Sequence, residues 1–441
     1  MAQKKPYRGR RGQKRAAPGA PVSVVVDTIG ARGDGIATRS DTGERLYIPG
    51  VLPGEHVTVR PGEPRGDGRS ARLEAVDAAA PERVEPPCPH FGRCGGCALQ
   101  HMAPEALALW KRDLVVQALG RRGFDAEQTS GVAATLSLPA GTRRRATFAI
   151  KGQGGGAVLG FNARASHAVV PIETCLLPSD ALRALVAPLR DLIRTVPLPR
   201  KGGDCAVTLT DTGADVVLDL GAEPDLETRE RLAAFAAAHD LARLSLRIDG
   251  GPPEPAAARR LPEVRLGGRL VALPAGGFLQ PSREGEAALV DHVLRAVEAA
   301  PPGPVADLFG GIGTFALPLH GAGRVVHLAE GAAEAVGAVS ALGLDGLTAE
   351  HRDLFERPLG AKGLKRFAAV VFDPPRAGAQ AQAAELAAHG PGVVVAVSCN
   401  PATFARDARL LVDGGYTMES VVPVDQFPWA AHVEVVAVFR R

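Results

Sequence analysis

The feature that most constrains the fold of this chain is a series of short apolar runs in its C-terminal part. They lie at Val305–Phe309, Val325–Ala329, Ala368–Phe372 and Val393–Val397, and helical stretches separate several of them. Runs that are apolar throughout are typical of parallel strands buried on both faces of a sheet. Residues 269–441 are therefore predicted to form a doubly wound α/β domain. A β-hairpin of Thr417–Val424 and Val433–Arg440 is expected to complete it.

The composition indicates a packed protein of several domains. The chain has 441 residues, 46% of them hydrophobic and 22% charged, which is enough for roughly two to four domains. No apolar stretch approaches the roughly 18 to 20 residues that cross a bilayer, so we expect a cytoplasmic protein that makes no contact with a membrane. We also expect it to be a monomer. In the cytoplasm the six cysteines are expected to be thiols, metal ligands or catalysts, not structural disulfides.

The first part of the chain is predicted to be a basic disordered tail, residues 1–20. Its positive charges are Lys4, Lys5, Arg8, Arg10, Arg11, Lys14 and Arg15, with no acid among the first fifteen residues. Such a run neutralises the phosphates of nucleic acid and releases their counterions. A solvated tail without a partner explains it equally well.

Residues 21–77 are predicted to form a small OB-like β-barrel. Short β-rich runs occur at Val22–Ile29, Gly35–Thr38, Arg45–Ile48, Glu55–Arg60 and Arg69–Val76, and turn-forming Gly, Pro and Asp residues separate them. OB folds often bind single-stranded nucleic acid. A basic surface is expected from Arg32, Arg39, Arg45, Arg60, Arg65, Arg69 and Arg72. An SH3-like barrel without a role in RNA binding is the alternative.

Residues 78–268 are predicted to form a central α+β domain. An amphipathic helix is expected over residues 103–121, with Lys111, Arg112 and Arg121 on its polar face. Residues 143–175 alternate as strands do, whereas residues 196–265 contain no interpretable motif.

A cysteine-rich loop opens this central domain. Cys88, Cys94 and Cys97 have the spacing C-x5-C-x2-C between proline and glycine residues, and Cys175 is the best candidate for a fourth ligand. Ligation by cysteine alone favours a [4Fe–4S] cluster, with zinc as the alternative. Cys205 lies outside any motif and is expected to be structural.

A glycine-rich turn in the C-terminal domain predicts a nucleotide-type cofactor site. The segment Asp307–Phe315 follows a strand and leads into a helix, where glycines let the backbone approach a ligand. Glu330, Asp353 and Asp373 follow later strands, and an acid in the place of Glu330 can bind two ribose hydroxyls. Ligands of open α/β sheets bind at the carboxyl ends of the strands, so these side chains are expected to converge. A nicotinamide dehydrogenase fits the glycines but not the remaining residues, and helix-capping acids are the simpler alternative.

Cys399 and Glu434 are the candidate catalytic pair. Cys399 directly follows a strand and precedes a helix, whose positive end can stabilise a thiolate. A thiolate can add to an electron-poor ring so that a neighbouring carbon becomes nucleophilic, and a base must afterwards remove a proton from that carbon. Glu434 is the candidate base. The simpler interpretations are a buried cysteine and a surface glutamate.

Together these segments resemble the RNA uracil-5-methyltransferases, in particular the 23S ribosomal RNA branch with a TRAM domain and an iron–sulfur cluster. The matching segments, in chain order, are 33–37, 48–55, 88–101, 160–161, 166–167, Cys175, 278–280, 307–315, 373–376, 398–401 and 425–434.

The resemblance implies a class I, Rossmann-like methyltransferase domain behind the TRAM and iron–sulfur domains. It implies RNA as partner, with the target uridine flipped out of its fold, Cys399 as nucleophile and Glu434 as base. S-adenosylmethionine contacts are implied at Gln280, Phe309, Thr314, Glu330, Asp353 and Asp373, and a [4Fe–4S] cluster at Cys88, Cys94, Cys97 and Cys175. The chain departs from the family at Ser282, usually asparagine, at Gly310, often cysteine, and over 336–347, where an Asn-rich run is missing.

Several alternatives remain at the level of sequence. A transfer RNA uridine methyltransferase would use the same chemistry. An RNA cytosine-5-methyltransferase would place its cysteine after a proline, and methylthiotransferases use a C-x3-C-x2-C spacing. A non-catalytic iron–sulfur RNA-binding protein or redox sensor would tolerate the loss of Cys399.

Overall fold

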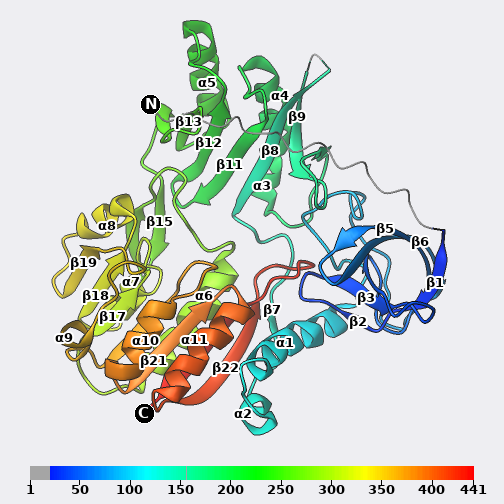
Figure 1. The fold of residues 1–441 in the computed structure, drawn as a ribbon. Helices are drawn as coiled ribbons and strands as arrows, with labels where there is room; N and C mark the ends of the chain where they lie inside the picture. Colours follow the sequence, from blue (N-terminus) through cyan, green and yellow to red (C-terminus); the bar gives the residue numbers. More distant parts are fainter. Residues whose placement is uncertain (1–19, 155) are drawn as a thin grey trace, which may run out of the picture. The chain divides into compact units, whose positions relative to one another are not determined.

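A computed structural model describes residues 20–154 and 156–441 of the chain, and Figure 1 shows their helices and strands. The described residues fall into two compact units. The first comprises residues 20–87 and 98–103, and the second comprises residues 88–97 and 104–441. The tail predicted for residues 1–20 lies outside the described residues except for Ala20.

The first unit is built on a six-stranded sheet. Its strands are β1 (Val22–Val25), β2 (Thr28–Ile29), β3 (Asp34–Thr38), β4 (Arg45–Pro49), β5 (His56–Arg65) and β6 (Gly68–Ala78), in the order β1-β5-β6-β4-β3-β2. Val57 and Val59 of β5 and Leu46 and Ile48 of β4 are fully buried in its core. The five predicted strands are all present, and the first of them is split in two. The OB-like classification remains a prediction.

The prediction that this unit has a basic surface is wrong. Six of the seven arginines form ion pairs with carboxylates of the same unit: Arg39 with Asp41, Arg45 with Asp67, Arg60 with Glu74, Arg65 with Asp34, Arg69 with Glu44, and Arg72 with Glu74. Counting arginines overlooked the acids that the strand pairing brings beside them. Most of the positive charge is therefore balanced within the unit.

The middle of the second unit is a seven-stranded sheet in the order β10-β9-β8-β11-β12-β13-β14. Its strands are β8 (Arg145–Gln153), β9 (Gly156–Asn162), β10 (Val169–Pro171), β11 (Gly203–Thr210), β12 (Gly213–Leu220), β13 (Arg243–Ile248) and β14 (Glu254–Ala258). Helices α3 (Asp180–Ala184), α4 (Val186–Leu192) and α5 (Leu226–Ala238) and the 3-10 turn η1 (Ile193–Thr195) accompany it. Cys205 is fully buried in this core, and a hairpin of β15 (Glu263–Leu266) and β16 (Arg269–Ala272) follows.

The C-terminal domain is an eight-stranded sheet in the order β19-β18-β17-β20-β21-β23-β22-β7. The strands are β7 (Leu136–Ser137), β17 (Val305–Leu308), β18 (Val326–Glu330), β19 (Leu347–His351), β20 (Ala369–Phe372), β21 (Val393–Ser398), β22 (Thr417–Asp425) and β23 (Glu434–Arg440). Strands β17 to β21 are parallel to one another, and β22 and β23 form the antiparallel hairpin. The predicted doubly wound sheet and its hairpin are confirmed.

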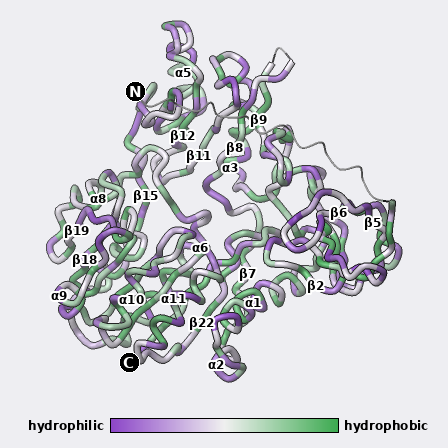
Figure 2. Tube along the Cα trace, in the orientation of Figure 1, coloured by the Kyte–Doolittle hydropathy of each residue, from purple (hydrophilic) through white to green (hydrophobic). Residues whose placement is uncertain are grey.

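Helices cover both faces of this sheet. They are α6 (Arg283–Glu298), α7 (Ala316–Gly321), α8 (Ala333–Ser340), α9 (Ala361–Leu364), α10 (Gln380–His389) and α11 (Pro401–Asp413). Val394 and Ala396 of β21 face the core that contains α10 and α11, whereas Val393, Val395 and Val397 face the core that contains α6. Such strands must be apolar on both sides. Figure 2 shows largely hydrophobic segments around α10 and α11.

The segment before β8 belongs to this C-terminal layer. Helices α1 (Pro104–Gly120) and α2 (Ala126–Ser130) lie in it, and Val115 and Leu119 share a core with strands β17 to β23. Lys111, predicted on the polar face of α1, is fully buried instead. None of the helices in residues 20–154 and 156–441 is long and apolar enough to cross a bilayer.

Candidate active site

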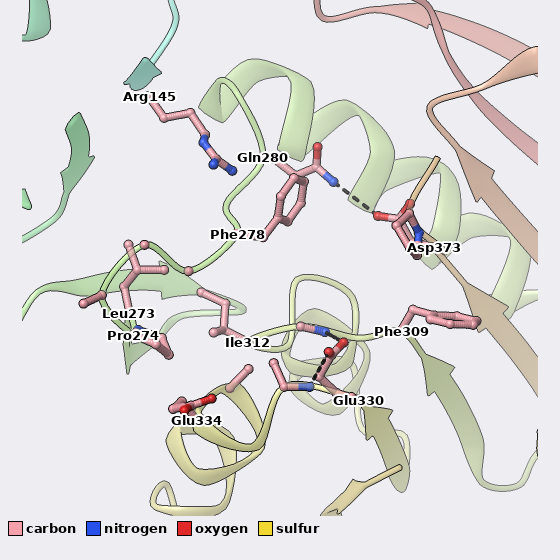
Figure 3. Close-up of a pocket in the computed structure, with 18 of the residues that line it drawn as sticks. Arg145, Leu273, Pro274, Phe278, Gln280, Phe309, Ile312, Glu330, Glu334 and Asp373 are labelled. Atoms are coloured by element: carbon pink, nitrogen blue, oxygen red, sulfur yellow. Dashed lines mark hydrogen bonds between the residues drawn. The ribbon is translucent and has the colours of Figure 1, made fainter. Parts of the chain in front are cut away.

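A cavity of about 1360 Å³ opens at the carboxyl ends of β17, β18, β20 and β21. Seven of the eight residues predicted for catalysis or cofactor binding line it: Gln280, Phe309, Glu330, Asp353, Asp373, Cys399 and Glu434. Figure 3 shows how four of these, Gln280, Phe309, Glu330 and Asp373, lie around it. Ligand pockets of typical proteins occupy roughly 300 to 1,000 Å³. This cavity therefore has room for more than one small molecule.

The glycine-rich turn after β17 forms the floor of the cavity. Phe309, Gly311 and Gly313 have positive φ angles of 60°, 55° and 92°, a conformation that glycine adopts without strain. The two carboxylate oxygens of Glu330 accept hydrogen bonds from the backbone N–H groups of Gly311 (3.0 Å) and Ala332 (2.8 Å) (Figure 3). Glu330 thus fixes the turn, and it also lines the cavity.

Gly310 is required by close packing in this turn. A Cβ atom there would lie 2.8 Å from the side chain of Leu328 and 3.0 Å from Oδ2 of Asp307. A cysteine is frequent in the family at this position. In this chain it would force Leu328 to move.

Asp307, near the end of β17, is hydrogen-bonded to the backbone that follows the glycine-rich turn. Its Oδ2 accepts a hydrogen bond from the N–H of Ala316 (2.8 Å), and Oδ1 has no hydrogen-bond partner among the described residues. Burial raises the pKa of Asp307 to about 8, opposed by the hydrogen bond from Ala316 and reinforced by the charges of Asp373 and Glu330. Three carboxyl groups close together favour the arrival of a cation, because a positive charge would stabilise their ionised forms.

A chain of amide hydrogen bonds holds Asp373. Nε2 of Gln280 donates to Oδ2 of Asp373 (3.3 Å), as the dashed line in Figure 3 shows. Nε2 of Gln426 in turn donates to Oε1 of Gln280 (3.2 Å). Burial raises the pKa of Asp373. The sequence motifs contained both Gln280 and Gln426 but gave no sign that they contact each other.

Of the two remaining residues predicted to bind the cofactor, Asp353 lies at the cavity and Thr314 does not. Asp353 lines the cavity, and its Oδ1 accepts the backbone N–H groups of Phe355 (2.9 Å) and Glu356 (3.3 Å). Thr314 is buried and is not among the lining residues. Ser282 caps helix α6, since its Oγ accepts a hydrogen bond from the N–H of Gly285 (3.0 Å). This capping role accounts for the serine there.

Cys399 and Glu434 are brought together by the pairing of β21 with β23. Ser398 pairs with Val435 in this antiparallel ladder, so Cys399 and Glu434 are the next pair outward. Side chains of directly opposed residues lie on the same face of a sheet. Cys399 is partly exposed and Glu434 is 5% exposed. Residues 35 positions apart in sequence thus face one cavity.

The electrostatics of the pair differ from the expectation. Helix α11 begins beside Cys399, and Asn400 caps it by accepting the N–H of Ala402 (3.1 Å), so the helix was expected to favour a thiolate. Burial instead raises the pKa of Cys399 to about 11, and the charges of Glu434 and Asp373 raise it further in the same direction. Burial, with Asp373 nearby, also raises the pKa of Glu434. Burial and the neighbouring carboxylates therefore oppose the thiolate that the helix was expected to favour.

The charge of Arg376 acts on both members of this pair, and this residue was not among the predicted site residues. Its charge lowers the pKa values of both Cys399 and Glu434. The side-chain amide of Asn400 donates to the backbone oxygen of Arg376 (3.1 Å), and Nη2 of Arg376 contacts Nε2 of His432 (3.1 Å). Its place in the matching segment 373–376 was the available signal for this residue.

Comparison with known proteins agrees with this geometry. Residues 347–441 match the family model described as tRNA (Uracil-5-)-methyltransferase. An RNA methyltransferase of Brucella suis is 42% identical over 424 residues, which cover 95% of this chain and 97% of that protein. The 23S rRNA (uracil(1939)-C(5))-methyltransferase RlmD of Halomonas elongata is 34% identical, covering 93% of this chain and 88% of its own length. This chain belongs to the RNA uracil-5-methyltransferase family.

A solved member of the family shares the fold. The Pyrococcus abyssi tRNA (uracil-54, C5)-methyltransferase, solved in complex with S-adenosyl-L-homocysteine, superposes with a TM-score of 0.72. The match covers 95% of this chain and all of that protein at 22% identity. The predicted class I methyltransferase fold is therefore confirmed for this RNA uracil-5-methyltransferase.

The cysteine loop of this methyltransferase lies beside strand β9. Cys94 forms a β-bridge with Ala163, and the N–H of Gly95 donates to the backbone oxygen of Asn162 (2.9 Å). Within residues 20–154 and 156–441, no group of three or more His, Cys, Asp or Glu side chains is arranged to hold a metal ion. The four predicted ligands do not form a closed metal site in this structure.

Proposed function

We propose that this protein methylates carbon 5 of one uridine in RNA, with 23S ribosomal RNA as substrate. The observation that carries the proposal is the opposition of Cys399 and Glu434 across β21 and β23 at the cavity. The chemistry needs a nucleophile and a base at one ring, and Cys399 and Glu434 supply one of each.

The cavity fits S-adenosylmethionine as the methyl donor. The turn at Gly311 allows close approach of a ligand to the backbone, and the carboxylate of Glu330 suits two ribose hydroxyls. We propose Gln280, Phe309, Glu330, Asp353 and Asp373 as its contacts, because all five line the cavity. Thr314 would act indirectly, through the packing of the turn. When bound, the donor supplies an electrophilic methyl group on a positively charged sulfur.

The proposed reaction uses the two side chains in sequence. The thiolate of Cys399 adds to carbon 6 of uracil, and the electron pair of the ring double bond then makes carbon 5 nucleophilic. After carbon 5 has taken the methyl group, Glu434 accepts the proton from carbon 5. That electron pair restores the double bond, and the carbon–sulfur bond breaks to release the Cys399 thiolate. Arg376 favours the ionised forms of both groups.

The walls of the cavity suit a polyanion such as RNA. Four arginines line it, Arg143, Arg145, Arg243 and Arg376, and Arg243 among them is paired with Asp215. The guanidinium of Arg145 lies 5.1 Å from the ring centre of Phe278, which is 61% exposed. An exposed aromatic ring beside a cation is a surface on which unstacked bases bind. A flipped uridine entering the cavity would lose a few kcal/mol of stacking, which such contacts offset.

The choice of ribosomal over transfer RNA rests on sequence identity, which is 34% to the Halomonas protein and 22% to the Pyrococcus protein. The Halomonas relative, named for 23S ribosomal RNA, matches 93% of this chain at 34% identity. The family model and the solved Pyrococcus protein are named for transfer RNA, the former over residues 347–441. A transfer RNA substrate with the same chemistry is therefore the second candidate.

Mapping of 5-methyluridine by mass spectrometry tests the substrate. RNA from a strain that lacks this protein is expected to lose one 5-methyluridine from its large-subunit ribosomal RNA, and the wild-type gene should restore it. Loss from transfer RNA instead would transfer the proposal to the second candidate. Unchanged 5-methyluridine in both RNAs would contradict the proposal.

We also propose that Cys88, Cys94, Cys97 and Cys175 share one [4Fe–4S] cluster. The donor set supports it, and so does the proximity of the thiols: the charge of Cys88 raises the pKa values of Cys94 and Cys175, after the larger effect of burial. Metal binding commonly couples to local folding, so the four side chains would draw together on binding. The domain bounds proposed with this cluster are 21–77, 78–268 and 269–441, but α1 and β7 of the second range pack with the C-terminal sheet.

Metal analysis of anaerobically purified protein tests the cluster. Wild-type protein is expected to contain iron and inorganic sulfide, and Cys175→Ala should lose most of both. Cys205→Ala is the control, because Cys205 is fully buried in the core of the seven-stranded sheet and its loss should leave the iron content unchanged. Zinc at full occupancy, or iron retained in Cys175→Ala, would contradict the proposed ligand set.

A further inference from the structure

Lys111 is an unusual residue because its side chain is fully buried. It lies on α1, is 0% exposed, and is among the largest fully buried side chains. Its Nζ forms an ion pair with Oδ1 of Asp425 (2.5 Å) and donates to the backbone oxygen of Phe427 (2.9 Å). Burial of an ion pair usually brings no net gain in stability over apolar residues of similar size. A role beyond stability is therefore worth seeking in what Lys111 holds.

Both partners of Lys111 belong to the segment that leads to Glu434. Asp425 ends β22, Glu434 begins β23, and residues 426–433 connect them. The Oδ1 atom of Asp425 also accepts the N–H of Phe427 (2.9 Å), so one carboxylate is shared by the lysine and the start of the connection. Lys111 therefore contacts the chain where the connecting segment begins, at Asp425 and Phe427.

The connecting segment forms one wall of the cavity. Phe427 and His432 both line it, and their rings meet edge to face at 6.0 Å between centroids. Trp429, between them, has a φ angle of 60°, a conformation that costs free energy in a residue other than glycine and persists only where the surroundings impose it. The segment is thus held in one conformation by contacts outside itself.

We propose that Lys111 is a positioning residue, which holds residues 425–433 from the side of α1 so that Glu434 keeps its place beside the substrate ring. This inference rests on the proposed role of Glu434 as base. Lys111 does not line the cavity, and it acts through Asp425 and Phe427. Proton removal from carbon 5 is the step that depends on the position of Glu434.

The test is turnover and covalent-adduct measurement in Lys111→Met, which keeps the length of the side chain and removes its charge. A displacement of about 1 Å at a reacting group can slow a step on the order of 100-fold, so we expect turnover to fall by about 10- to 100-fold. The fraction of enzyme bound covalently to uridine RNA should rise, because Cys399 still adds while proton removal is slowed. A merely destabilised protein would show less adduct, not more.

Two further variants keep the test decisive. Lys111→Met combined with Asp425→Asn removes both charges and should restore thermal stability, yet turnover should stay low and the adduct should still accumulate. Arg112→Met is the matched control on the same helix, since Arg112 donates to the backbone oxygen of Val132 (3.0 Å) and lies near Asp113. It should leave turnover and adduct unchanged.

The outcomes separate this inference from the proposed function. If the double variant regains wild-type turnover together with stability, Lys111 is only structural and the inference is overturned. The same follows if turnover falls in Lys111→Met without any rise in adduct. If wild-type enzyme itself forms no adduct with 5-fluorouridine RNA, the proposed function fails instead.

Discussion

Cys399→Ala is expected to reduce methyl transfer to RNA by about four orders of magnitude or more, the scale seen when a covalent nucleophile is removed. Without the thiol, carbon 5 of uracil keeps its weak nucleophilicity and the methyl donor is bound without reacting. The change removes only one sulfur atom from a partly exposed position, so the free energy of unfolding should change little. Binding of S-adenosylmethionine should persist, because the glycine turn and Glu330 are untouched.

Methyl transfer from labelled donor, together with trapping on 5-fluorouridine RNA, measures this prediction. Fluorine at carbon 5 cannot leave as the proton does, so wild-type enzyme should remain bonded to such RNA, and Cys399→Ala should not. Cys205→Ala is a suitable control, since Cys205 is fully buried in the core of the seven-stranded sheet. This variant enzyme should be trapped on the RNA as the wild type is. An active Cys399→Ala enzyme would refute covalent catalysis at this residue.

Glu434→Gln should cause the second largest loss of turnover. In contrast to Cys399→Ala, it should raise the amount of covalent adduct. Glutamine has the same size and cannot accept the carbon 5 proton, so turnover should fall by about 10²- to 10⁴-fold, the usual contribution of general base catalysis. Cys399 can still add to the ring. Enzyme linked to methylated RNA should therefore accumulate on ordinary uridine, and electrophoresis under denaturing conditions would reveal it.

The pH profile supplies an independent signature of the same variant. Burial raises the pKa of Glu434 and of Cys399, and both groups act in their ionised forms. The value of kcat/KM for the wild type should therefore rise as pH increases above neutrality. The charge of Glu434 also raises the pKa of Cys399, so Glu434→Gln should lower it and form the adduct at lower pH than the wild type.

A carboxylate elsewhere in the same hairpin provides the control. Glu419 on β22 forms an ion pair with Arg440 on β23 at the surface. Glu419→Gln should leave turnover, adduct level and pH profile unchanged. If Glu434→Gln behaved like this control, another group would have to serve as the base.

The sequence by itself determined the C-terminal sheet and the convergence of most of the site. The run Val393–Val397 is apolar at every position, and only a strand covered on both faces needs that pattern. Parallel strands place their carboxyl ends at one edge, so Glu330, Asp373 and Cys399 could be grouped before any coordinates were known. Local periodicity and chain direction suffice for such predictions.

Only the tertiary structure decided the burial and the charged neighbours of each side chain. Lys111 is typical of a solvated helix face in sequence, yet it is buried against Asp425, 314 positions away. Cys399 was expected to have a stabilised thiolate, but burial and Glu434 raise its pKa to about 11. The free energy of a charge depends on the solvent and ions around it, and these come from segments distant in the chain. No local pattern encodes them.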